Sequence, residues 1–148
     1  AIKYNLRPLA VHYDNTWNSA LASSNLYKVL NKLNIDLYTF VLNNNESDDL
    51  FRSFFKSGVS EIEATTDLAL IEIMYRAAYK YNVKYILAGT NNSTEGMRMP
   101  KEWNWFKYDK KNIFSIHKRF GKMKIKSLPT FGTLDYIYYG IHTIRVSF

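Results

Sequence analysis

Polar side chains with ligand-binding chemistry follow an apolar run near the start of the chain. His12, Asp14 and Asn15 come directly after the apolar residues 9–11. A backbone that leaves a strand here can hydrogen-bond the edge of a base, and Asp14 or Asn15 can reach a ribose or a metal ion. The same two residues are also good caps for a following helix. The two interpretations are compatible, and the sequence leaves both open.

A second group of such residues follows the apolar residues 84–88. Gly89, Thr90 and Asn91 offer an unhindered backbone with a hydroxyl and an amide, which lets a ligand approach closely. An ordinary turn is the simpler explanation of these three residues. Glu95, further along the same loop, is either a ligand or base or a solvated loop residue.

Thr66 and Asp67 form a third group, at the predicted start of a helix. Free N–H groups at a helix N-terminus can receive an anion, and Asp67 can bind Mg²⁺ or position a substrate. Helix capping explains the same residues by itself.

Other chemistries are excluded by what the sequence lacks. The chain has no Cys, so a disulfide framework, a Cys-ligated metal and a catalytic thiol are ruled out. The three His residues, 12, 117 and 142, have no metal-ligand spacing, and we expect His117 to be structural. With only six Gly, the chain has neither a GxxxxGK[ST] loop nor a GxGxxG fingerprint.

The elements that must position these residues follow from apolar periodicity. Continuous apolar runs predict strands at 8–13, 37–42 and 84–88, and 144–148 is a further candidate strand. Helical spacing predicts helices at 17–33, capped by Asn15 or Asn18, and at 50–56, 65–81, 112–120 and 134–142. In the 65–81 helix, Glu72, Arg76 and Lys80 form one narrow polar stripe, along which Glu72 and Arg76 can pair.

Continuous apolar strands alternating with amphipathic helices predict an α/β fold with a parallel sheet covered on both faces. Ligands bind such sheets beyond the carboxyl ends of the strands, which here are residues 12–18, 42–45 and 89–96. We expect one domain over 1–148, with a core at about 1–96 and a basic, aromatic-rich extension at about 97–148.

The net charge of +7 is concentrated in that extension. Ten of the twenty basic residues lie between Arg98 and Lys126, with only two acids among them. Such a segment is either a solvated face or a site for an anionic partner such as phosphate, an acidic sugar, RNA or a membrane surface. The chain also has twelve Tyr and nine Phe, so we expect some rings to face a partner. We expect no membrane span.

Taken in order, the motifs RPLAVHYDNTWNS, DLYTFVLN, TTDLAL, KYILAGTNNSTEG and IHKRFG resemble the N-acetyl sugar amidotransferases. These belong to the PP-loop ATP pyrophosphatase superfamily, and the resemblance covers nearly the whole chain. It implies a Rossmann-like parallel sheet whose SGGxDS-type phosphate loop stands a short distance before Ala1. It also implies that the chain is the middle piece of a larger cytoplasmic enzyme and is inactive alone.

The chemistry that the resemblance implies is ATP- and Mg²⁺-dependent amidation of a nucleotide-linked or acidic N-acetyl sugar, for bacterial lipopolysaccharide and O-antigen. A glutaminase with a cyclase-like subunit supplies ammonia. Residues that match the family's nucleotide-binding segments are Val11, His12, Asp14, Asn15, Gly89, Thr90 and Asn91. Thr66 and Asp67 match a segment facing the same cleft and are the catalytic candidates. For substrate binding we select Glu95, Lys118 and Arg119. Thr16 replaces a Gly that is common in the family.

Two alternatives stay open. A lysidine-type tRNA-modifying enzyme of the same superfamily needs no cysteine, and the basic segment could bind RNA. A non-catalytic nucleotide-binding or assembly module is the other alternative. We expect the sugar nucleotide or the ATP phosphates, rather than nucleic acid, to be the anionic target, and the sequence leaves homo-oligomerisation open.

Overall fold

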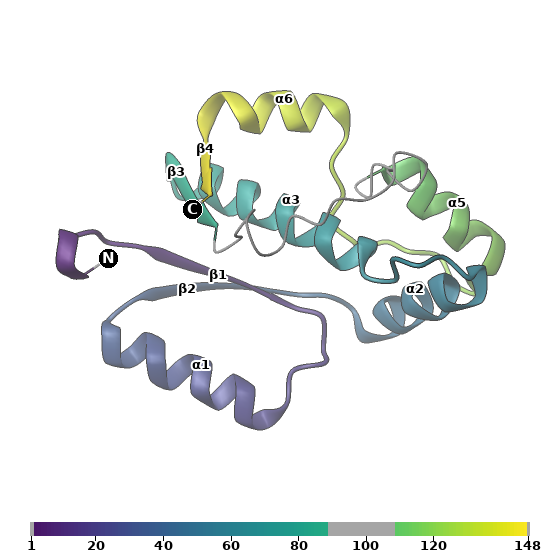
Figure 1. Ribbon diagram of the computed structural model, residues 1–148, viewed down its shortest axis with the longest axis horizontal. Coiled ribbons are helices and arrows are strands. Elements are labelled where there is room, and N and C mark those ends of the chain that lie inside the picture. Colours follow the sequence, from purple (N-terminus) through teal and green to yellow (C-terminus); the bar gives the residue numbers. More distant parts are fainter. Residues whose placement is uncertain (1, 89–108, 148) are drawn as a thin grey trace.

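The computed structural model describes residues 2–88 and 109–147, and Figure 1 shows their arrangement. The short 3₁₀ helix η1 (Ile2–Tyr4) precedes the strands and helices. These are β1 (Leu9–Asp14), α1 (Ala20–Leu33), β2 (Asp36–Val41), α2 (Asn44–Ser57), α3 (Ala64–Lys80), β3 (Tyr85–Ala88), α5 (Lys110–Phe120), α6 (Thr133–His142) and β4 (Ile144–Ser147). The predicted α/β class is confirmed.

β1 and β2 form a parallel pair connected through α1. Their register runs from Leu9 opposite Asp36 to Asp14 opposite Val41, so both strands end at the same edge. α1 begins at Ala20 because the Ser19 hydroxyl accepts a hydrogen bond from the N–H of Ala22 at 3.1 Å. The predicted cap at Asn15 or Asn18 is therefore wrong.

β3 pairs in parallel with β4, about sixty residues later in the chain. Within the described residues, the strands thus form two separate parallel pairs rather than the single sheet that was predicted. No residue of β1 or β2 is fully buried, so the described helices cover this pair of strands only in part. α1 buries only Leu30, so this helix covers little of the strand pair that it connects.

α2 is twice as long as predicted: it spans fourteen residues and begins at Asn44 instead of Leu50. The side chain of Asn43 accepts a hydrogen bond from the N–H of Glu46 at 3.2 Å and starts the helix. Gly58, at φ 70°, ends it in the left-handed conformation that glycine adopts without strain. The run of Asn residues at 43–45 is therefore a cap followed by the start of the first helical turn.

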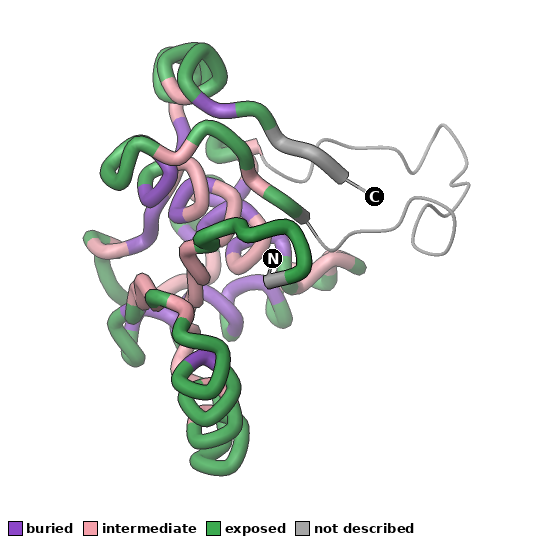
Figure 2. The backbone as a smooth tube through the Cα atoms, turned by 90° about the vertical axis from the view of Figure 1, so that its left-hand side faces the viewer, coloured by how far each residue is buried: buried purple, intermediate pink, exposed green. Residues whose placement is uncertain are grey.

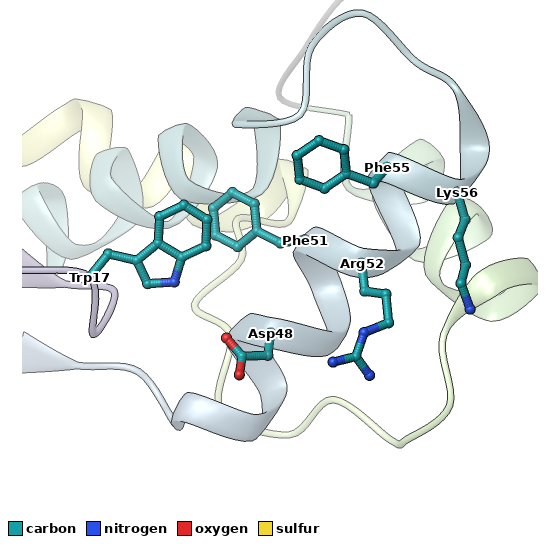
Figure 3. Close-up of a pocket in the computed structure, with 6 residues that line it drawn as sticks. All are labelled: Trp17, Asp48, Phe51, Arg52, Phe55 and Lys56. Carbon is teal, nitrogen blue, oxygen red and sulfur yellow. The ribbon is translucent and has the colours of Figure 1, made fainter.

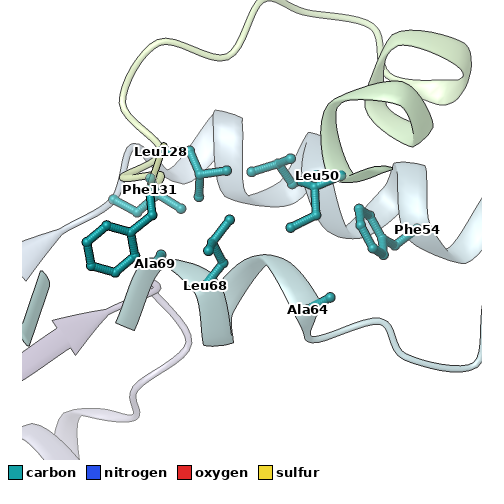
Figure 4. Packing of buried hydrophobic residues seen from close by; sticks show 9 residues of the cluster. Leu50, Phe54, Ala64, Leu68, Ala69, Leu128 and Phe131 are labelled. Atoms are coloured by element: carbon teal, nitrogen blue, oxygen red, sulfur yellow. The ribbon is translucent and has the colours of Figure 1, made fainter. Parts of the chain in front are cut away.

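The main core lies between α2, α3, α5 and the segment that leads into α6 (Figure 4). Its largest fully buried side chains include Phe54 and Leu50 from α2, Leu68 from α3 and Ile113 from α5. Ala64 and Ala69 are also buried there, and their small side chains let α3 approach its neighbours closely. The basic segment after α5 is thereby attached to the rest of the fold.

Most residues of α1 and α6 are exposed (Figure 2), and several large apolar side chains are among them. α6 has no buried residue, and Leu134 and Ile141 are 80% and 77% exposed. Tyr136 and Tyr138 are exposed on the same helix. The prediction that some aromatic rings face a partner agrees with this exposure but is not tested by it.

Glu72 corrects the predicted polar stripe of α3. It pairs with Arg76 one turn later, as predicted, but its side chain is buried, whereas Arg76 is half exposed. Burial raises the pKa of Glu72 above its ordinary value, and the guanidinium of Arg76 opposes that shift. The polar stripe therefore begins at Arg76, and Glu72 occupies a core position.

Candidate functional site

The edge where β1 and β2 end is the candidate ligand site, because parallel strands present their carboxyl ends to ligands. The ladder extends one step further there, since the N–H of Leu42 donates to the carbonyl of Asp14 at 3.0 Å. α2 begins two residues later, so a helix N-terminus lies beside the end of β1. Its first N–H groups carry partial positive charge.

Three polar side chains are hydrogen-bonded into a cluster at the end of β1. The Nδ2 of Asn18 lies 3.3 Å from Oδ1 of Asp14 and 3.3 Å from Nε2 of His12. Because alternate residues of a strand share a face, His12 and Asp14 lie on the same side of β1. The cluster combines amide donors, a carboxylate and an imidazole, which together suit hydroxyls and heterocyclic nitrogens.

Asp14 and Asn15 cap the loop after β1 instead of the next helix. Oδ1 of Asp14 accepts a hydrogen bond from the N–H of Thr16 at 2.7 Å, and Oδ1 of Asn15 accepts one from the N–H of Trp17 at 3.3 Å. Short side chains that bond their own backbone two residues on are typical of such turns. Asp14 and Asn15 therefore do bond backbone N–H groups, as the capping interpretation expected, but these belong to the loop and not to the next helix.

Thr16 ties this loop to the start of α2. Its hydroxyl donates to Oδ1 of Asn44 at 2.5 Å, and the hydroxyl of Ser47 donates to the carbonyl of Asn15 at 3.4 Å. Thr16 has φ 72°, a left-handed conformation that is uncommon for a β-branched residue. This is the position at which the sequence resemblance implies a Gly, and the backbone adopts the conformation that Gly favours.

The structure brings together only some of the predicted site residues. Val11 lies on β1 between His12 and Ala10, so its side chain faces the side opposite His12 and Asp14. Thr66 and Asp67 lie half-buried in the first turn of α3, a helix that packs against β1. Gly89, Thr90, Asn91 and Glu95 lie outside the described residues.

Lys118 and Arg119 are exposed in the last turn of α5. α5 packs against α2, and Figure 1 shows it above α2, away from the β1–β2 pair. The guanidinium of Arg119 lies 5.3 Å from the centre of the Phe120 ring. Among the described residues, no hydrogen bond or ion pair connects either residue to the strand-end cluster.

Two buried carboxylates on α2 were missed by sequence reasoning. Oδ2 of Asp49 accepts hydrogen bonds from Nε2 of His117 at 2.8 Å and from the N–H groups of Lys122 and Met123 at 2.9 and 3.1 Å. Burial would raise the pKa of Asp49, but these hydrogen bonds and the electrostatic interaction with His117 lower it below its ordinary value. The expectation that His117 is structural agrees with this contact.

Glu46 binds residues 126–127, which follow the two residues held by Asp49 in the segment after α5. Its Oε2 accepts from the N–H of Lys126 at 3.0 Å and from the N–H and hydroxyl of Ser127 at 2.8 Å each. These hydrogen bonds outweigh burial and lower the pKa of Glu46. The sequence did contain a signal that Glu46 and Asp49 are buried. They lie on the same face of α2 as the core residues Leu50, Ser53 and Phe54.

The loop after β1 also contributes to a pocket of about 450 Å³ on the outer face of α2 (Figure 3). A larger pocket of about 870 Å³ lies between α3, the start of α5 and the start of α6, with Tyr75, Phe131 and Tyr136 among its lining residues. Within the described residues, no group of three or more His, Asp and Glu side chains is placed to hold a metal ion.

None of the helices in the described part of the chain combines the length and apolar character that crossing a membrane requires. Comparison with known proteins found no protein-family model, no curated protein and no solved structure that matches this chain.

Proposed function

We propose that the chain carries the adenosine-binding part of an ATP-dependent amidotransferase that acts on an N-acetyl sugar. The hydrogen-bonded cluster of His12, Asp14 and Asn18 at the common end of β1 and β2 is the observation that carries the proposal. It lies where parallel α/β folds bind nucleotides. The three cluster residues belong to RPLAVHYDNTWNS, one of the motifs that carry the family resemblance.

The reaction we propose for the whole enzyme has two steps. The carbonyl oxygen of the N-acetyl group attacks the α-phosphorus of ATP, and the bond to pyrophosphate breaks. Ammonia then adds to the resulting adenylylated imidate carbon and AMP leaves, which produces an acetamidino sugar. Such chemistry depends on positioning and charge stabilisation more than on a side-chain nucleophile.

The residues of the β1–β2 edge have binding and orienting tasks in this proposal. The backbone and polar groups at 12–18 hold the base and ribose, and the hydrogen bonds of Asp14 and Asn15 fix that loop. A nucleotide-bound Mg²⁺ takes most of its ligands from phosphate and water and needs only one or two carboxylates. In this proposal Asp14 supplies one such carboxylate, and the described residues form no group of three or more His, Asp and Glu that could hold a metal ion by themselves.

Site-resolved NMR titration with ATP tests this proposal. We expect amide shifts to concentrate at residues 11–18 and 41–44, and we expect the double variant His12→Ala and Asn18→Ala to reduce them. ATP-induced shifts that avoid both segments would falsify the proposal.

A further inference from the structure

The outer face of α2 carries an aromatic row and a charged row side by side (Figure 3). Phe51 and Phe55 are one helical turn apart, and Trp17 from the loop after β1 extends their row. Arg52 and Lys56 are also one turn apart and extend along the other side of the pocket. We call this surface the α2 ledge: Trp17, Asp48, Phe51, Arg52, Phe55 and Lys56.

Trp17 is held in place before any ligand arrives. Its indole stacks on the ring of Phe51 with centroids 4.4 Å apart and an interplanar angle of 27°. The backbone N–H of Trp17 donates to Oδ1 of Asn15, and the hydroxyl of the neighbouring Thr16 donates to Oδ1 of Asn44. The indole is nevertheless 58% exposed, whereas Phe51 is 6% exposed. A rigid, exposed aromatic ring binds a flat partner at low entropic cost.

The two cations of the ledge are available to an anion. Arg52 and Lys56 are both exposed, and neither forms an ion pair with another described residue. Residues one turn apart on a helix lie about 5–6 Å apart at Cβ, so both side chains can reach one phosphate group. The C-terminal end of a helix disfavours an anion, which means that binding there depends on these two side chains.

Asp48 makes one end of the α2 ledge acidic, whereas the other end is basic. It is exposed one turn before Arg52, and Figure 3 shows it below the Trp17 and Phe51 rings. A carboxylate only accepts hydrogen bonds when ionised, so this end suits a ring N–H or a sugar hydroxyl. The opposite end, at Arg52 and Lys56, suits a phosphate.

We propose that the α2 ledge is a second binding site, which takes a nucleobase stacked on Trp17 and its phosphate on Arg52 and Lys56. A free nucleotide and a single-stranded nucleic acid share this chemistry, since both combine a π-face with a phosphate. The proposal does not rest on the amidotransferase function, because the ledge residues lie outside the cluster of His12, Asp14 and Asn18.

The test compares AMP, inorganic phosphate and a short single-stranded oligothymidylate, titrated by calorimetry against the full chain. Removal of a base-stacking aromatic typically costs about 1–3 kcal/mol, so Trp17→Leu should weaken AMP binding by about fivefold or more. Trp17→Phe should weaken it less, because a ring is kept. The double variant Arg52→Gln and Lys56→Gln should weaken AMP and phosphate binding together.

α1 offers matched controls for both rows. Lys28 and Lys32 are also exposed cations one turn apart, and Tyr27 is an exposed aromatic residue. The double variant Lys28→Gln and Lys32→Gln, and the single variant Tyr27→Leu, should bind AMP as the unmodified chain does. Far-UV circular dichroism confirms that each variant is folded.

The outcomes are distinct. If oligothymidylate binds more tightly than AMP and the ledge variants weaken both, the proposal is supported and the ligand is a nucleic-acid strand. If AMP binds more tightly and the same variants weaken it, the ligand is a free nucleotide. If neither binds, or if the α1 controls weaken binding as much as the ledge variants, the proposal is overturned. If AMP binding is lost only in the His12 and Asn18 double variant, the ledge is refuted while the strand-end proposal stands.

Discussion

Replacing Asp49 with Asn isolates what its buried carboxylate contributes to stability. Asp49 is 4% exposed, and its carboxylate receives hydrogen bonds from His117, Lys122 and Met123. Asn has almost the same shape, but it lacks the charge and presents an NH₂ group that cannot accept. Hydrogen bonds to charged groups contribute about 1.5–3 kcal/mol each, and a buried donor left without an acceptor costs about 1–3 kcal/mol.

Solvent can reach the 122–127 segment once it loosens, and water then satisfies part of the lost hydrogen bonding. We therefore expect Asp49→Asn to lower the free energy of unfolding by about 2–4 kcal/mol. Urea unfolding followed by far-UV circular dichroism at neutral pH measures it. Asp48→Asn is the matched control, because Asp48 is the exposed neighbour on the same helix and should change stability by less than about 0.5 kcal/mol.

The pH dependence gives an independent check on the same carboxylate. Since the folded-state pKa of Asp49 is lowered, its contribution is present above the unfolded pKa of about 4 and is lost as pH falls through the folded value. The unmodified chain should therefore lose more stability between neutral and acidic pH than Asp49→Asn does. Equal losses in Asp48→Asn and Asp49→Asn, or parallel pH profiles, would refute the reasoning.

Two further predictions concern the backbone. Gly121→Ala should destabilise the fold by about 2 kcal/mol or more in thermal unfolding, because its Cβ would overlap the His117 ring and lie 2.6 Å from the His117 carbonyl oxygen. Gly140→Ala, in the open interior of α6, should instead stabilise it by about 0.5–1 kcal/mol, and the reverse order would contradict both assignments. At Thr16, where φ is 72°, Gly should be more stable than Val by about 1 kcal/mol, since Val keeps the strained branched side chain and loses the hydroxyl. If urea unfolding finds Val the more stable, the left-handed conformation of Thr16 is wrong.

Local patterns were sufficient to predict most elements. The apolar runs located β1, β2 and β3 to within a residue or two, and the 3.6-residue spacing located α3, α5 and α6. These signals depend only on neighbours in the chain. The prediction for α2 failed because Asn is a poor helix former inside a helix, yet Asn43 acts as a cap and Asn44 and Asn45 follow it in the first turn.

Long-range pairing could not be predicted in the same way. The pairing of β3 with β4 joins Tyr85 to Ile144, and nothing in either short run identifies its partner. The carboxylates of Glu46 and Asp49 likewise bind backbone N–H groups, which every residue carries, so the sequence 122–127 holds no matching signal. Residue type predicts a side chain's own preferences but not which backbone will lie next to it.

The same distinction separates the two parts of the candidate site. His12, Asp14 and Asn18 lie within seven residues at the end of one strand. A local motif was enough to find His12 and Asp14, whereas Asn18 was considered only as a helix cap. The α2 ledge joins Trp17 to side chains more than thirty residues later, and only the pairing of β1 with β2 brings them together. The bonds from Thr16 to Asn44 and from Ser47 to Asn15 connect the two parts. The strand-end cluster and Trp17 therefore share one loop, and a ligand at the cluster contacts the same backbone that presents the stacking ring of the α2 ledge.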